Sequence, residues 1–123
     1  MTIARLERFT NILTQLEVNV PGLEATAIFD MDGLVIASRL PSNVDEEIIG
    51  AMSAAILSIG NRSGKELDRG DMRRIFVEGD HGSIVILSVG EELVLVALVG
   101  TDVKLGLLFF ECRRSIARIL DIS

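Results

Sequence analysis

The sequence contains no tryptophan and no tyrosine, a single cysteine and a single histidine. Because Cys112 is alone, a disulfide within the chain is excluded, and a reducing compartment such as the cytoplasm is expected. Catalytic triads need a base beside a nucleophile, whereas His81 lies between Asp80 and Gly82, a setting typical of a solvated turn. No cluster of cysteine and histidine has metal-ligand spacing, and no glycine-rich turn offers a phosphate cradle. We therefore expect no enzyme, no cofactor and no small-molecule substrate.

Basic residues are also in deficit, since 12 lysines and arginines stand against 18 aspartates and glutamates, for a net charge of −6. This balance argues against a phosphate backbone as a partner, and only five phenylalanines are available for base stacking. The longest apolar runs, residues 93–99 and 105–110, are far shorter than the roughly 20 residues of a membrane-spanning helix. We expect no nucleic-acid partner and no membrane insertion.

The sequence does contain the pattern of one α+β domain that covers residues 1–123. Apolar residues recur at helical spacing from Ile3 to Leu16, and Ser42 or Asn43 can cap a long middle helix. Connectors of a few residues favour antiparallel pairing of neighbouring strands. The predicted order is αββαβββα, with one five-stranded antiparallel sheet covered by helices. The predicted strands cover residues 25–29, 34–38, 71–78, 83–89 and 93–99.

The middle helix has two different sides when its residues are projected at roughly 100° each. Large apolar side chains lie on one side, namely Ile48, Ile49, Met52, Ile56 and Ile59. Small ones lie on the other, namely Gly50, Ala51, Ala54 and Ser58. We expect the large side to pack on the sheet and the small side to contact the same helix of a second copy, which predicts a homodimer. The alternative, that small residues merely fill an exposed helix face, stays open.

The strand predicted at residues 71–78 is more charged than the two that follow, which favours the edge of the sheet. Its apolar stretch Ile75-Phe76-Val77 could pair with the same strand of a second copy and make one continuous sheet. We interpret Arg73 and Arg74 as charges that keep the edge soluble, not as catalytic arginines. The candidate dimer-interface residues are therefore Gly50, Ala51, Ala54, Ser58, Arg73, Ile75 and Val77.

The segment around Asp30 and Asp32 has two interpretations. An apolar strand followed by Asp-x-Asp-Gly is similar to the first motif of haloacid dehalogenase-type phosphatases, in which Asp30 would attack a phosphate and Asp32 would act as acid and base. That chemistry also needs further phosphate ligands and a second acidic group for Mg²⁺, and the chain offers no convincing second acidic cluster. We favour the other interpretation, in which Asp32-Gly33 forms a tight hairpin turn.

Taken together, these features resemble the roadblock family. The resemblance rests on the element order, on the hairpin Asp30-Met31-Asp32-Gly33-Leu34-Val35-Ile36-Ala37, and on the apolar strand at residues 93–99. It covers nearly the whole chain, and stand-alone prokaryotic members are the most similar. It implies a longin-like, profilin-like layered fold, dimerisation through the long middle helix and an edge strand, and no catalytic residue.

Roadblock proteins serve dynein complexes as light chains, form scaffolds for Ras-like GTPases, and in bacteria regulate a polarity GTPase. The resemblance therefore implies a cytoplasmic homodimeric module that binds and regulates a Ras-like small GTPase. One alternative is a structural subunit of a larger hetero-complex, such as a motor light chain. The other is the Mg²⁺-dependent phosphatase that uses Asp30 and Asp32.

Overall fold

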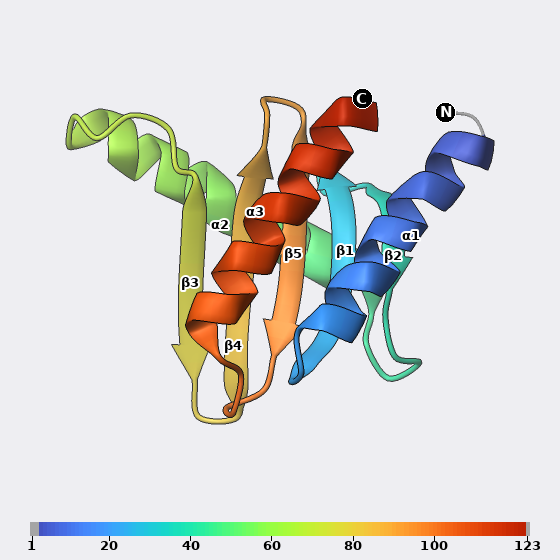
Figure 1. Ribbon diagram of the computed structural model, residues 1–123. Coiled ribbons are helices and arrows are strands. Elements are labelled where there is room, and N and C mark those ends of the chain that lie inside the picture. Colours follow the sequence, from blue (N-terminus) through green and yellow to red (C-terminus); the bar gives the residue numbers. More distant parts are fainter. Residues whose placement is uncertain (1–2, 123) are drawn as a thin grey trace.

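The computed structural model describes residues 3–122, which form three helices and one five-stranded sheet in the predicted αββαβββα order (Figure 1). The elements are α1 (Ile3–Asn19), β1 (Leu23–Asp30), β2 (Val35–Arg39), α2 (Glu46–Glu66), β3 (Arg74–Gly79), β4 (Gly82–Val89), β5 (Leu93–Val99) and α3 (Leu105–Ile122). No helix within this described range is both long and apolar enough to cross a bilayer.

The sheet is antiparallel throughout and has the strand order β2-β1-β5-β4-β3. Two local units, the β1–β2 hairpin and the β3–β4–β5 meander, join where β1 pairs with β5. Ile28 lies opposite Leu95 at this junction, and both side chains are buried. The predicted place of β3 at an edge of the sheet is confirmed.

The helices cover the sheet unequally, because α1 and α3 lie side by side on one face while α2 alone crosses the other (Figure 1). Under α1 and α3 the core is large and includes Phe9, Leu13 and Leu108. Under α2 it is smaller and is centred on Phe29 and Leu57. Alternate residues of β1, β4 and β5 supply the two cores, since successive side chains point to opposite faces of a strand.

Helix α2 begins at Glu46, because Asp45 is its N-cap and accepts hydrogen bonds from the backbone N–H groups of Glu47 (2.9 Å) and Ile48 (3.3 Å). The predicted caps Ser42 and Asn43 were wrong, since both lie in the turn that precedes this cap. Such a cap satisfies N–H groups that have no partner inside the helix.

The hairpin turn is longer than predicted and occupies residues 31–34. Gly33 has a φ of 86°, whereas Asp32 has none of the positive backbone angle that a two-residue turn would require of it. The backbone N–H of Gly33 donates to the carbonyl of Asp30 (3.1 Å), and that of Asp30 donates to the carbonyl of Leu34 (2.9 Å). The hairpin is therefore confirmed, but its tight Asp32-Gly33 turn was wrong.

Candidate functional site: the outer face of α2 and the edge strand β3

Helix α2 packs very closely against the sheet because glycines lie at the contact. Gly50, Ser53, Leu57 and Gly64 are the buried residues of this helix. A Cβ atom on Gly50 would lie 2.9 Å from Cε1 of Phe29 and would also collide with the carbonyl oxygen of Gly33. The hairpin turn and the first half of α2 therefore touch through their backbones, which requires glycine on both sides.

In the second half of α2, glycines also allow close packing, here against Met72 before β3 and Ile75 within it. A Cβ atom on Gly60 would lie 2.7 Å from Cδ1 of Ile75, and one on Gly64 would lie 2.8 Å from Cε of Met72. The side chain of Asn61 accepts a hydrogen bond from the backbone N–H of Met72 at 2.8 Å. These contacts hold α2 and β3 in a fixed relation.

Because the glycine side faces the sheet, the large apolar side chains of α2 point outward. Ile48 is 59% exposed, Met52 57% and Ile59 67%. Ala51 and Ala55, on the same side of the helix, are exposed as well. We call these five residues the outer α2 face. The prediction that Ile48, Met52 and Ile59 pack on the sheet was wrong, although Ile49 and Ile56 do pack against the core there.

The small residues predicted to meet a second copy are divided between the two sides. The assignment of Gly50 to that surface was wrong, since it is buried against Phe29 and Gly33. Ala51 and Ser58 are exposed, and Ala54 is half-buried. Ala54 and Ser58 line a hollow of about 400 Å³ beside the helix, together with Met31, Asn61, Arg62 and Lys65.

Strand β3 presents an unpaired edge next to α2. Ile75 lies opposite Ile86 of β4, and Val77 lies opposite Ile84, so both side chains are on the α2 side of the sheet. Ile75 is half-buried against Gly60, whereas Val77 and Arg73 are exposed. The strand begins at Arg74, later than predicted, although Arg73 still accepts a backbone hydrogen bond from Ser88 (3.0 Å).

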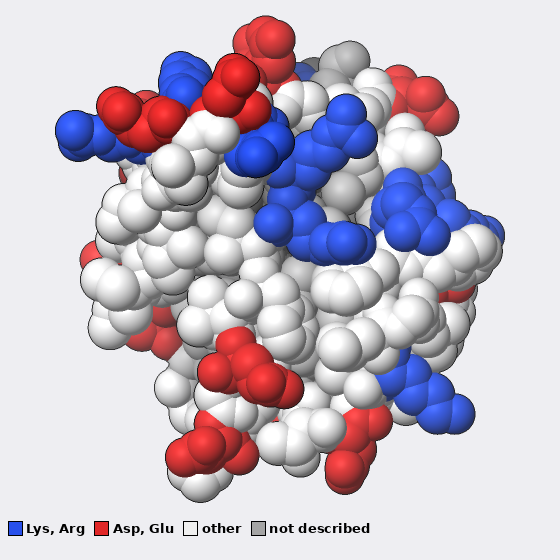
Figure 2. Space-filling model, turned by 90° about the vertical axis from the view of Figure 1, so that its left-hand side faces the viewer, with Lys and Arg blue, Asp and Glu red and all other residues white. Residues whose placement is uncertain are grey.

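The side of the molecule that carries this edge is uneven in charge. Figure 2 looks onto it and shows uncharged surface in the centre, a group of basic side chains with acidic ones around it in the upper half, and further acidic side chains near the bottom. An uncharged centre flanked by charge is the usual composition of a protein–protein interface. The outer α2 face and the adjoining β3 edge therefore make the candidate interaction site.

The side chain of Asp30 holds the hairpin turn. Its Oδ1 atom accepts hydrogen bonds from the backbone N–H groups of Asp32 (2.9 Å) and Leu34 (3.0 Å). Asp32 is exposed at the tip. Between residues 3 and 122, no three His, Cys, Asp or Glu side chains come together in a group that could hold a metal ion. The arrangement gives Asp30 a structural role as an acceptor within the turn.

The lone cysteine and the lone histidine are on different elements of the fold. Cys112 is buried in the core under α3. Burial raises the pKa of its thiol, the carboxylate of Glu111 adds to the rise and Arg74 opposes it, and together they bring the pKa to about 12. A thiol of this kind is a core side chain and not a nucleophile. His81 is exposed in the β3–β4 turn.

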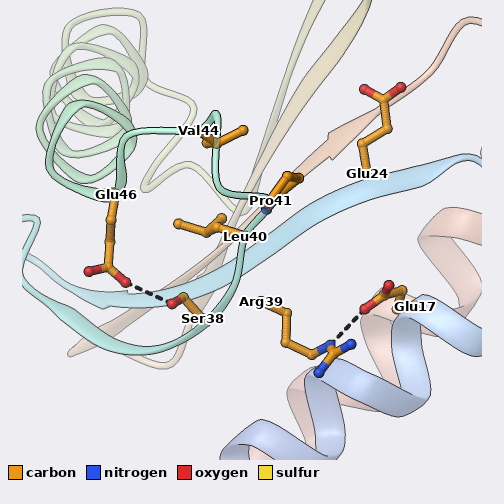
Figure 3. Close-up of a pocket in the computed structure, with 8 residues that line it drawn as sticks. All are labelled: Glu17, Glu24, Ser38, Arg39, Leu40, Pro41, Val44 and Glu46. Carbon is orange, nitrogen blue, oxygen red and sulfur yellow. Dashed lines mark hydrogen bonds and ion pairs between the residues drawn. The ribbon is translucent and has the colours of Figure 1, made fainter.

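A broad, open hollow of about 650 Å³ lies beside β2 and is lined by Glu17, Glu24, Ser38, Arg39, Leu40, Pro41, Val44 and Glu46 (Figure 3). Nε of Arg39 donates to Glu17 at 2.7 Å, and the hydroxyl of Ser38 donates to Glu46 at 2.7 Å. These two bonds tie β2 to α1 on one side and to α2 on the other. The polar groups of the hollow therefore hold β2 against its two neighbouring helices.

The sequence reasoning missed which side of α2 is free, and one signal could have revealed it. Gly50, Gly60 and Gly64 fall on one side of the helix together with Leu57. A glycine inside a helix costs up to about 1 kcal/mol relative to alanine, so three on one side indicate a close backbone approach. That side had to be the one against the sheet.

The comparisons with known proteins agree with this fold. The family model of the Roadblock/LC7 domain matches residues 10–99. Protein MJ1340 of Methanocaldococcus jannaschii is 36% identical over 105 residues, which is 85% of this chain and 91% of that protein. Two solved structures are similar in fold. The Roadblock/LC7 domain of Streptomyces avermitilis is 21% identical with a TM-score of 0.86, covering 91% of this chain and 94% of that one. Myxococcus xanthus MglB is 19% identical with a TM-score of 0.91, covering 99% and 92%.

Proposed function

The chain belongs to the Roadblock/LC7 family, and we propose that it is a non-catalytic homodimeric module of the cytoplasm that binds and regulates a Ras-like small GTPase. One observation carries the proposal. The outer α2 face exposes Ile48, Met52 and Ile59 in a row along a helix whose other side is already used by the sheet. A surface helix with apolar side chains on both sides is typical of a helix that packs between two partners.

A second copy is the partner that fits this face. Two α2 helices related by a two-fold axis would cover each other's apolar side chains, and the same axis would bring the two β3 edges together. Alanines at positions 51 and 55 would let the helices approach closely between the larger side chains. Pairing of the β3 edges would also satisfy backbone groups that are otherwise left to water.

The GTPase is proposed from the family, since some of its members form scaffolds for Ras-like GTPases or regulate them. A dimer would offer such a partner a broad surface made of two α2 helices and their flanking loops. The acidic net charge of −6 would speed the encounter with a basic GTPase surface without determining which GTPase binds.

The test uses the purified chain and each Ras-like GTPase encoded in the same genome, loaded with GDP or with a non-hydrolysable GTP analogue. Titration calorimetry is expected to detect binding to one of them with a preference for one nucleotide state, and the rate of GTP hydrolysis or nucleotide exchange is expected to change. If no GTPase binds in either state, the regulatory part of the proposal is wrong. Recovery of the chain from its host in a stable hetero-complex without a GTPase would favour a structural subunit instead.

A further inference from the structure

The opposite side of β3 carries a cluster of arginine and phenylalanine. Arg74 and Phe76 lie opposite Leu87 and Val85, whose side chains belong to the core under α1 and α3, so both point toward α3. There the guanidinium carbon of Arg74 lies 4.1 Å from the centre of the Phe109 ring. The rings of Phe76 and Phe109 meet edge to face at 6.2 Å.

Arg113 completes the cluster, because it follows Phe109 by four residues on α3 and therefore lies on the same side of that helix. We call Arg74, Phe76, Phe109 and Arg113 the Arg–Phe patch. Basic side chains gather in the upper half of Figure 2, with acidic side chains above and to the upper left of them, on a molecule whose net charge is −6.

Among residues 3–122, the guanidinium groups of Arg74 and Arg113 have no ion-pair or hydrogen-bond partner, although that of Arg74 stacks on Phe109. Two ion pairs occur among residues 3–122, and they join Arg39 to Glu17 and Arg114 to Glu111. Arg74 and Arg113 take part in neither pair, and no hydrogen bond of their guanidinium groups is present in the described part of the chain. Both side chains are exposed. Like charges that gather without counter-charges cost free energy, which an acidic partner would recover.

Arg74 is also held in place before any partner arrives. Stacking of a guanidinium on an aromatic ring leaves its N–H donors at the edge of the plane, where they can meet a carboxylate in a bidentate fashion. Phe76, which is 36% exposed, adds an apolar surface next to these donors. The patch therefore combines two carboxylate-binding groups with one hydrophobic contact.

We propose that the Arg–Phe patch is a docking site for an acidic segment of a partner protein, with two carboxylates on Arg74 and Arg113 and an apolar side chain on Phe76. A linear segment fits better than a lipid surface. Glu78 and Asp80 are also exposed, at and just beyond the end of β3 that lies away from Arg74. A flat anionic bilayer would meet these groups together with the arginines, whereas a peptide can follow the patch alone.

The Arg–Phe patch shares strand β3 with the proposed dimer surface, but its side chains are on the opposite face of the sheet from the outer α2 face. The Arg–Phe patch faces α3, whereas the outer α2 face lies on the other side of the sheet. An acidic segment could therefore bind while the outer α2 face is covered by a second copy. The result of the peptide-binding experiment does not depend on whether the chain binds a GTPase.

The experiment selects short random peptides displayed on phage against the immobilised full chain and, in parallel, against the Arg74→Gln/Arg113→Gln variant. Selected peptides are then labelled and titrated by fluorescence anisotropy. The expected result is enrichment of sequences with at least two Asp or Glu beside an apolar residue. The double variant should bind them at least about tenfold more weakly, because charge-assisted hydrogen bonds to arginine contribute about 1.5–3 kcal/mol.

The matched control is Arg62→Gln/Lys65→Gln, which removes the same charge from exposed positions on α2. Circular dichroism verifies that both double variants are folded. Equal weakening in the control would reduce the effect to net charge and overturn the proposal. So would the absence of any acidic enrichment. Stronger binding to vesicles of anionic phospholipid than to any selected peptide would also overturn it, in favour of a membrane surface.

Discussion

The face of the sheet under α1 and α3 is filled by large side chains, whereas the face under α2 is reached by glycines. Phe9, Leu13 and Leu108 are completely buried on the first face. On the second face, Gly50 and Gly60 leave no room even for a Cβ atom, so α2 lies very close to the sheet. Two helices, α1 and α3, cover the first face, and α2 alone covers the second.

The difference teaches what each face is for. On the α1/α3 side, both helices contribute large, fully buried side chains such as Phe9 and Leu108 to one core, although each helix also exposes apolar residues elsewhere. On the α2 side, Ile48, Met52 and Ile59 remain exposed, and burying an isoleucine or methionine is worth about 1.5–3 kcal/mol. The α2 side is therefore the incomplete one, and a second chain would complete it.

The largest effect is expected on the filled face. Phe9→Ala should lower the free energy of unfolding by about 3–5 kcal/mol, because the ring is fully buried and its removal leaves a cavity. Urea denaturation followed by circular dichroism measures the change. Ile3→Ala on the same helix, at a largely exposed position, should change it by less than about 0.5 kcal/mol. Similar losses for the two variants would contradict the placement of α1.

A smaller effect is expected at the glycine contact. Gly50→Ala should destabilise the chain by about 1–3 kcal/mol, because the added methyl group collides with the Gly33 carbonyl and with Phe29. The control is Gly106→Ala in α3, where a Cβ meets nothing within 4 Å. Stability there should stay unchanged or rise by up to about 1 kcal/mol. A neutral Gly50→Ala would show that α2 lies farther from the sheet.

The link between α2 and β3 should be weaker still. Asn61→Ala removes the acceptor for the Met72 N–H and should cost about 0.5–1.5 kcal/mol, the usual net contribution of one hydrogen bond. Amide hydrogen exchange should accelerate at residues 72–79 and stay unchanged in β1 and β5. Uniform acceleration over the whole sheet would mean that Asn61 supports global stability instead of the position of the edge.

The smallest effect is expected on the reactivity of the Cys112 thiol, which lies in the core under α1 and α3. Since the pKa of Cys112 is raised to about 12, the native thiol stays protonated through mildly alkaline pH. Alkylation by iodoacetamide should therefore remain slow at about pH 9, where an exposed thiol with a pKa near 8.5 is mostly thiolate. The rate should rise sharply in denaturing urea.

The control for this prediction is Val18→Cys in a Cys112→Ala background, which places a thiol on the exposed side of α1. Its alkylation rate should follow an ordinary thiol titration in the native state. If native Cys112 titrates in the same way, the core under α3 is open to solvent.

The sequence was sufficient to predict the element order, the antiparallel sheet and the edge position of β3, because each depends on local periodicity and short connectors. It was not sufficient to orient α2, because this helix has apolar residues on both sides and periodicity cannot rank them. Because large apolar side chains were expected to face the sheet, Ile48, Met52 and Ile59 were placed against it. The close approach of Gly33 to Gly50 instead turns these three side chains outward. That approach joins segments that only the folded chain brings together.

The Arg–Phe patch could not be predicted from the sequence for a related reason. Arg74 was interpreted as a charge that keeps the edge soluble, and nothing local indicates that it stacks on Phe109 in another element. Residues 35 positions apart meet there only because α3 packs along the meander. Pairwise contacts of this kind need the tertiary structure.

The most direct test of the incomplete α2 side is the solution mass, measured by light scattering across a dilution series. The wild type should have about twice the chain mass of 13.4 kDa. Met52→Glu/Ile59→Glu should have the mass of one chain, because two carboxylates on the outer α2 face would be buried in the contact. Val18→Glu, an equally exposed apolar position on α1, should remain a dimer. A wild type with the mass of a single chain throughout would contradict the account.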